Sequence, residues 1–301
     1  MCLSRGQIRK ALSGFYYVYS EGETYQTRAR GNFRNKNITP LVGDDVIFKS
    51  DSTTDGYLLE ILPRKNELIR PPVANIDQAV LIVSCVEPDF SANLLDRFLV
   101  YLEYQQITPI IYMTKTDLLD NILYQEIEEI CRYYQKIGYD VLLPKFQDPD
   151  SLLGELERYF PENITVFMGQ TGAGKSTLIN KISPELALET GEISQSLGRG
   201  KHTTRHVEFI PLLDGLVGDT PGFSALDLPD MELSELSKQF IEMNRASEFC
   251  KFRECRHLHE PSCEVKKQVE QGEISESRYK NYLQMLDELE NRKPVYGRSK
   301  N

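Results

Sequence analysis

The feature that most constrains the fold is a glycine-rich octapeptide, Gly169-Gln-Thr-Gly-Ala-Gly-Lys-Ser176. It matches the pattern G-x-x-x-x-G-K-[S/T], whose glycines let successive backbone N–H groups turn toward phosphate oxygens. A strand-like segment, Ile164–Met168, precedes it and a helical pattern begins at Lys175, so the strand–loop–helix context is right. The octapeptide therefore predicts an α/β domain with a phosphate-binding loop.

Each position of this loop has an expected role. Lys175 places a positive charge at the outer phosphates and stabilises the charge that develops there, Ser176 is a ligand for Mg²⁺, and the helix N-terminus favours the anion. We expect contacts to a nucleotide from Gly169, Gln170, Thr171, Gly172, Ala173, Gly174, Lys175, Ser176 and Thr177.

Two downstream segments complete a phosphate site. Asp219-Thr-Pro-Gly222 follows a predicted strand; there an aspartate holds Mg²⁺ and the glycine N–H senses the outermost phosphate. The polar, glycine-containing stretch 191–205 is expected to be a mobile loop that carries the threonine which closes onto Mg²⁺. Thr204 is our first choice for that threonine and Thr203 the second.

A base-reading segment lies upstream of the loop instead of downstream. In Thr114-Lys-Thr-Asp117, Asp117 can accept two hydrogen bonds from guanine, which adenine does not offer there, and the stem of Lys115 can lie along the base. Thr114 stands where an asparagine is usual, so we expect a weaker tether to the phosphate loop. Thr116 completes the segment, and no Ser-Ala partner loop is recognisable, since Pro144 has no N–H.

The order of these segments is that of an ordinary GTPase, cut and rejoined. Chain termini often lie close together at the surface, so a sheet tolerates circular permutation. Alternating strand and helix patterns between residues 71 and 228 predict a doubly wound parallel sheet around the site. An adenine-specific ATPase or kinase is the rival reading, and Asp117 argues against it.

The first 70 residues carry several short strand patterns and predict a small barrel of the OB type, which ends at Pro71-Pro72. Phe15, Tyr17 and Tyr19 are expected to alternate into the barrel core. This region has a net charge of +3 in a chain of −10, and its basic residues are candidates for RNA contacts: Arg28, Arg30, Arg34 and Lys36.

Residues 229–301 are expected to be helical, with a cysteine cluster and a basic tail. Cys250, Cys255 and Cys263, with His257 or His259, supply three thiolates and one imidazole, a complete set for one structural Zn²⁺. Basic residues crowd this cluster and could contact RNA phosphates, foremost Lys251, Arg253 and Arg256. No apolar run is long enough to span a bilayer and no secretory signal is visible, so we expect a cytoplasmic protein.

Together these motifs resemble those of the ribosome small-subunit-dependent GTPase A family. They are Thr114–Asp117, Gly169–Thr177, Gly198-Arg-Gly-Lys-His-Thr-Thr204, Asp219–Gly222 and the Cys250–Cys263 cluster. The resemblance implies an OB barrel, a circularly permuted GTPase and a zinc domain that uses His257. It also implies action on the small ribosomal subunit and its rRNA late in maturation, with GTP hydrolysis stimulated by that subunit. We expect a monomer. Because D-x-x-G leads within a few residues into the helix that carries the zinc domain, we also expect hydrolysis to be coupled to release from the subunit.

The position after D-x-x-G, where many GTPases orient the attacking water with Gln, holds Phe223. His202 in the loop is our candidate to place this water, on its hydrogen-bonding chemistry and on the resemblance. The rival is an RNA-binding assembly factor that uses GTP as a clamp with incidental turnover.

Overall fold

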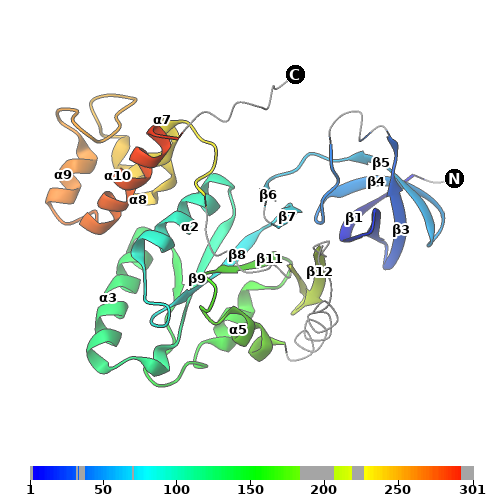
Figure 1. Cartoon of the computed structure of the whole chain (residues 1–301), viewed down its shortest axis with the longest axis horizontal. Helices are drawn as coiled ribbons and strands as arrows, with labels where there is room; N and C mark the ends of the chain where they lie inside the picture. Colours follow the sequence, from blue (N-terminus) through cyan, green and yellow to red (C-terminus); the bar gives the residue numbers. More distant parts are fainter. Residues whose placement is uncertain are drawn as a thin grey trace.

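The computed structural model describes residues 3–31, 33, 38–69, 71–183, 207–218 and 227–292. Three parts lie side by side: a β-barrel, a central sheet with helices, and a helical C-terminal part (Figure 1). The division at about residues 70 and 228 stays a prediction from the sequence.

The N-terminal part is a closed five-stranded barrel with strand order β1-β2-β3-β5-β4, closed by pairing of β4 with β1. Only β3 and β5 pair in parallel, and the remaining pairs are antiparallel. The OB-type prediction is therefore confirmed. The strands are β1 (Leu3–Leu12), β2 (Phe15–Ser20), β3 (Glu23–Ala29), β4 (Asp45–Ser52) and β5 (Asp55–Ile61).

The predicted orientation of the aromatic residues in β2 is wrong. Val18 and Ser20 are buried, and Tyr16 packs against the core. Because side chains alternate along a strand, Phe15, Tyr17 and Tyr19 point outward, where cationic side chains cover their rings. The run Phe15–Tyr19 is apolar or aromatic at every position, so periodicity did not tell the two faces apart.

The barrel is joined to the central part by paired strands. The C-terminal half of β1 pairs antiparallel with β12 (Val207–Leu212), and Lys10 forms an ion pair of 2.9 Å with Glu208. The short hairpin of β6 (Glu67–Ile69) and β7 (Pro72–Ala74) crosses the expected boundary. Pro72 begins a strand, contrary to our reading of the two prolines, since the first position of a strand tolerates the missing N–H.

Gly43 lies where the barrel touches β7 and β12. A Cβ at this position would lie 1.9 Å from the carbonyl oxygen of Ala74 and 3.0 Å from the ring of Phe209, and the glycine has φ +97°. One apolar core runs from the barrel interior to the sheet.

The central part is a six-stranded sheet of order β10-β9-β8-β11-β13-β12, parallel except for β12. Helices α2 (Ala92–Tyr104) and α3 (Asn121–Ile137) pack on one face, and α5 (Lys175–Ile182) packs on the other. Between β10 and β11 the chain forms only the short helix α4 (Leu153–Leu156) and a 3-10 turn (Glu157–Tyr159). The strands are β8 (Gln78–Ser84), β9 (Thr108–Thr114), β10 (Asp140–Leu142), β11 (Ile164–Gly169) and β13 (Gly215–Gly218).

The C-terminal part contains α7 (Leu233–Leu236), α8 (Ile241–Ser247), α9 (Glu264–Glu270) and α10 (Glu276–Glu290). α7 and α8 are separate helices, because Phe240 between them is extended (φ −106°, ψ 105°). This backbone lets its fully buried ring meet Tyr282 edge-on at 5.7 Å. One stripe of α10 packs into the core of the C-terminal part: Tyr279, Tyr282, Leu283, Leu286 and Leu289.

A buried ionic cluster fastens this part to the sheet. Arg278 of α10 is 1% exposed; its Nε and Nη2 donate to both carboxylate oxygens of Glu242, at 2.6 and 3.0 Å, and its Nη1 donates to Asp96 of α2. Tyr134 and Asn281 also donate to Asp96, each at 2.7 Å. Burial alone would lower the pKa of Arg278, but the two carboxylates raise it well above its ordinary value.

Candidate nucleotide site and metal centre

The sheet brings the base-reading segment and the phosphate loop to the same edge. Thr114 ends β9 and Gly169 ends β11, and both strands run parallel to β8 between them. The hydroxyl of Thr114 donates to the carbonyl oxygen of Ala173 at 2.6 Å. The segments that the sequence presents in inverted order are thus in direct contact, and the threonine does form a tether.

Glycine is required at several positions of the loop. Gly169, Gly172 and Gly174 have φ values of +152°, +83° and +94°, and a Cβ on Gly169 would lie 2.4 Å from the carbonyl oxygen of Ile82. Gly174 precedes α5, so Lys175 opens the helix, and Ser176 and Thr177 lie exposed in its first turn. This backbone leaves the N–H groups of the first turn of α5 facing the phosphate loop, and N–H groups at a helix N-terminus bind anions well.

The base-reading segment has a defined shape. Lys115 adopts the left-handed region (φ +61°), and Asp117 is exposed in the 3-10 turn Thr116–Leu118 that follows. The Lys115 ammonium donates to the carbonyl of Glu87, and Pro88 Cδ lies 3.7 Å from the place of a Cβ on Gly172. Glu87 and Pro88 therefore support both halves of the site. Sequence reasoning missed them because only tertiary structure brings their loop there.

The loop after β10 does not offer the usual backbone donor. Pro144 accepts a hydrogen bond from Tyr124 at 3.3 Å, and the N–H of Lys145 donates to the Ser151 hydroxyl at 2.8 Å.

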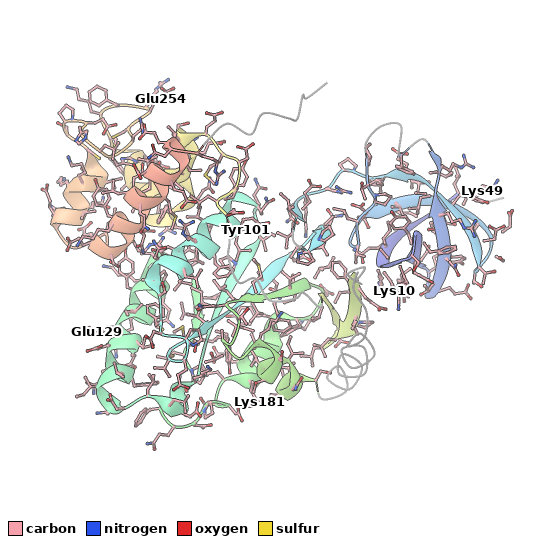
Figure 2. The ribbon with its side chains drawn as sticks, in the orientation of Figure 1. Lys10, Lys49, Tyr101, Glu129, Lys181 and Glu254 are labelled. Carbon is pink, nitrogen blue, oxygen red and sulfur yellow. The ribbon has the colours of Figure 1, made fainter. Side chains whose placement is uncertain are left out.

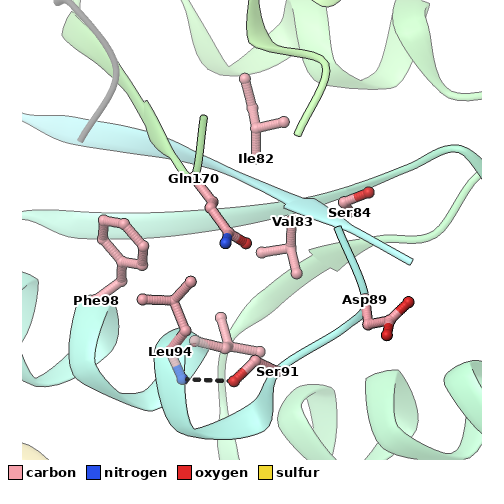
Figure 3. Close-up of a pocket in the computed structure, with 9 residues that line it drawn as sticks. Ile82, Val83, Ser84, Asp89, Ser91, Leu94, Phe98 and Gln170 are labelled. Atoms are coloured by element: carbon pink, nitrogen blue, oxygen red, sulfur yellow. Dashed lines mark hydrogen bonds between the residues drawn. The ribbon is translucent and has the colours of Figure 1, made fainter. Parts of the chain in front are cut away.

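A small cavity opens beside the phosphate loop, between the end of β8 and the start of α2 (Figure 3). Its volume is about 20 Å³, and the side chain of Gln170 points into it above Val83 and Leu94. The Ser91 hydroxyl accepts from the Leu94 N–H at 3.3 Å and caps α2. The walls of this cavity are mostly apolar, and its volume is far below that of typical ligand pockets, so it is too small to hold a nucleotide.

Several predicted residues lie outside the described residues. They are Thr203, Thr204, Asp219 and Gly222 of the phosphate-sensing segments, His202, and the basic residues Arg34 and Lys36.

The cysteine cluster assembles as a four-ligand set. The ligand atoms of Cys250, Cys255, His257 and Cys263 all lie within 4.8 Å of one another. His257 Nδ1 is 3.3 Å from Cys263 Sγ and 3.8 Å from Cys250 Sγ, and the two sulfurs are 4.0 Å apart. Tetrahedral Zn²⁺ would place such atoms about 3.5–3.8 Å apart. His259 is exposed and lies outside the set.

Neighbouring groups fix this set. Tyr279 donates to the carbonyl of His257 at 2.6 Å, and Tyr282 donates to that of Arg256 at 2.7 Å. Burial raises the pKa of Cys255 to about 12 and lowers the pKa of His257. The pocket alone therefore favours the neutral thiol of Cys255, and a bound cation would hold it as a thiolate. The donor set fits one Zn²⁺ and leaves no coordination position for catalysis.

The basic residues around the cluster differ in their contacts. Arg256 forms an ion pair of 2.9 Å with Glu290. Lys251 and Arg253 are exposed, and Lys251 lies 5.8 Å from the ring centroid of the exposed Phe252.

Comparison with known proteins decides the family. A model described as "RsgA GTPase" matches residues 61–229, and one described as "RsgA N-terminal domain" matches residues 5–58. The chain belongs to the RsgA GTPase family. It is 66% identical, over 98% of its length and 99% of the relative's, to a protein of Enterococcus faecalis named small ribosomal subunit biogenesis GTPase RsgA. Over 99% of the chain it is 58% identical to the whole of a protein of that name from Latilactobacillus sakei.

Solved structures agree along the whole chain. The crystal structure of YloQ, described as a circularly permuted GTPase, matches with TM-score 0.83, 46% identity and 98% coverage of both chains. That of YjeQ from Thermotoga maritima matches with TM-score 0.82 and 34% identity, covering 97% of this chain and all of the other. This RsgA-family chain is thus a circularly permuted GTPase with an OB-type barrel and a helical C-terminal part. None of its described helices could cross a membrane.

Proposed function

We propose that this GTPase acts in late maturation of the small ribosomal subunit in the cytoplasm, as a monomer. In this proposal the subunit and its rRNA stimulate GTP hydrolysis, and hydrolysis releases the protein. The observation that carries the proposal is the hydrogen bond from Thr114 to Ala173. It joins the segment that we predict to read guanine to the predicted phosphate loop, in a chain whose relatives are named for small-subunit biogenesis.

The permuted chain order supports a coupling between the bound nucleotide and the affinity of the protein for the small subunit. The loop predicted to close onto Mg²⁺ continues directly into β12, which pairs with β1 of the barrel. The Asp219–Gly222 segment continues into Leu228, which is buried in the C-terminal part, and Arg292 donates to its carbonyl at 2.8 Å. Loss of the outermost phosphate would therefore act on both outer parts at once.

A few residues would stabilise the reacting phosphate, select guanine and hold the two metal ions. Lys175 would stabilise charge on the transferring phosphoryl group, and Asp117 would select guanine. Ser176, Thr204 and Asp219 would hold Mg²⁺, which neutralises phosphate charge when bound. Cys250, Cys255, His257 and Cys263 would hold one structural Zn²⁺ that stabilises the C-terminal part.

The decisive measurement is GTP hydrolysis with and without small ribosomal subunits. We expect slow turnover by the protein alone and at least a tenfold rise with subunits. Affinity for the subunit should be higher with a non-hydrolysable GTP analogue than with GDP. The proposal would be refuted if GTP turnover did not change when subunits are added. It would also be refuted if the affinity for the subunit were equal with GDP and with the GTP analogue.

The water-positioning role of His202 has its own test. His202→Ala should lower subunit-stimulated turnover by 10²–10⁴-fold, the usual contribution of a positioned proton-transfer or orienting group, while GTP affinity changes little. His259→Ala, on the C-terminal part, is the matched control. Undiminished turnover in His202→Ala would end this assignment.

A further inference from the structure

A second cavity lies at the edge of the sheet opposite to the nucleotide site. The parallel strands β9 and β10 begin at this edge, and the helices that precede them, α2 and α3, end there. The cavity has a volume of about 400 Å³, which is within the range of small-molecule sites. Its lining includes Glu103, Ile107, Pro109, Tyr139, Asp140 and Ile241.

This lining combines carboxylates with apolar side chains. Glu103 in the last turn of α2 and Asp140 at the start of β10 supply the negative charges. Ile107, Pro109 and Ile241 supply the apolar surface. Because helix C-termini carry partial negative charge, the ends of α2 and α3 make the cavity more favourable for a cation. Mg²⁺ and Ca²⁺ require a shell of oxygen ligands, whereas an alkylammonium ion brings its own apolar stem and matches both parts of the lining.

The protein itself places a cation at the rim of the cavity. Arg245 of α8 donates from Nη1 to the carbonyl oxygen of Ile137, the last residue of α3, at 3.0 Å. Its Nη2 lies 3.4 Å from the place of a Cβ on Gly138, which lines the cavity. No lysine or arginine is among the described residues of the lining, so the interior keeps its negative charge.

Tyr139 gives an independent indication of a ligand. It is 4% exposed, and its hydroxyl has no hydrogen-bond partner among the described residues. The hydroxyl lies near the carboxylate of Glu103, whose pKa it lowers, but the two groups are not in hydrogen-bonding geometry. A buried hydroxyl without a partner costs free energy, and an N–H donor bound beside Glu103 would give it one.

We propose that this cavity binds a free aliphatic polyamine, with one ammonium group between Glu103 and the Tyr139 hydroxyl and a second ammonium group on Asp140. The alkyl chain lies along the apolar part of the lining. Ile241 belongs to the C-terminal part and the other lining residues belong to the central sheet and its helices, so a bound polyamine stabilises the contact between these two parts. The site is remote from the nucleotide edge, and the inference does not depend on the proposed GTPase function.

The test is calorimetric titration of the full chain with spermidine at about 0.15 M salt, which screens binding to scattered surface carboxylates. Glu103→Gln should weaken binding by about 10- to 100-fold, the usual effect of losing one charge-assisted hydrogen bond. Tyr139→Phe should weaken it by about 2- to 10-fold, because a neutral hydrogen bond is lost. Asp140→Asn should weaken it by about 2- to 5-fold, since Asp140 is exposed and its ion pair is screened.

Glu129→Gln is the matched control, because Glu129 is an exposed carboxylate of α3 that does not line the cavity (Figure 2). Its affinity for spermidine should stay within about twofold of that of the parent, a difference below the effect of one exposed ion pair. Equal affinities of the parent and Glu103→Gln would overturn the proposal, as would no binding by the parent at about 1 mM spermidine.

Thermal unfolding separates ligand binding from a purely structural role of Glu103. Spermidine should raise the melting temperature of the parent and of Glu129→Gln, and should leave that of Glu103→Gln unchanged. Equal rises in all three proteins would show that the polyamine binds elsewhere. Melting temperatures without spermidine establish that the variants fold, and GTP hydrolysis by the same samples reports the proposed GTPase function separately.

Discussion

The barrel and the helical C-terminal part both pack on the GTPase sheet, but through different chemistry. The barrel continues the sheet by pairing β1 with β12, and shares one apolar core with it. The C-terminal part keeps its own core and is fastened by the buried Arg278 cluster. A paired strand and a common core transmit displacement directly, whereas a buried ion pair is costly to desolvate but fixes one geometry.

Removal of the metal should give the largest effect and should act on the C-terminal part alone. Structural zinc supplies about 10–16 kcal/mol to small zinc modules, so chelation should unfold residues 241–290 and leave the barrel intact. Hydrogen exchange by mass spectrometry compares protection of the two regions with and without chelator. Equal loss of protection in the barrel would contradict the expectation that the metal stabilises the C-terminal part alone. The control variant is Cys131→Ala, which removes a buried thiol outside the cluster and should respond to the chelator as the parent does.

Breaking the ionic cluster should have the next largest effect. Arg278→Met leaves Asp96 and Glu242 buried without their cation and should cost about 3–5 kcal/mol of unfolding free energy. Lys280→Met on the same helix breaks an exposed pair with Glu276 and should cost less than about 1 kcal/mol. Denaturant unfolding measures both, and similar costs would show that the cluster does not fasten the C-terminal part.

The barrel contact is tested by Gly43→Ala, which should destabilise by about 2–4 kcal/mol. Gly14→Ala is the matched control, because Gly14 also has positive φ (+83°) but its Cβ would meet nothing within 4 Å. It should show only the backbone cost, about 1 kcal/mol. Equal effects in thermal unfolding would mean that the close approach to Ala74 is relieved by a small shift.

The smallest effect on stability is expected for Glu103, near the C-terminal end of α2. Burial raises the pKa of its carboxyl, partly offset by Tyr139 and Arg278. The folded state therefore holds the proton to higher pH than the unfolded state, whose pKa is near 4.3, and ionisation lowers stability as pH rises above that value. Glu103→Gln should stabilise by less than about 1 kcal/mol at pH 7 after solvent screening, and by nothing at pH 3.5. A gain of equal size at both pH values would contradict this cause.

Sequence reasoning succeeded where a motif fixes local backbone. The glycines of the phosphate loop, the strand before it and the helix from Lys175 follow from phosphate chemistry and are found as expected. It failed where the pattern was ambiguous or the contact distant. The aromatic run of β2 had no polar face to set its register, and β1, with outward charges at Arg5 and Lys10, was not recognised as a strand.

The residues by themselves determined the permuted order of the nucleotide motifs, the parallel sheet that this order requires, and the three cysteines of the metal centre, because each depends on residue type and spacing along the chain. The tertiary structure decided that His257 and not His259 joins these cysteines. Only the tertiary structure decided that Glu87 and Pro88 support the site, that β12 joins the barrel, and that Phe15, Tyr17 and Tyr19 face outward. Those outcomes depend on which surfaces meet in space, and pairing register and packing between distant segments leave no local signal in the sequence.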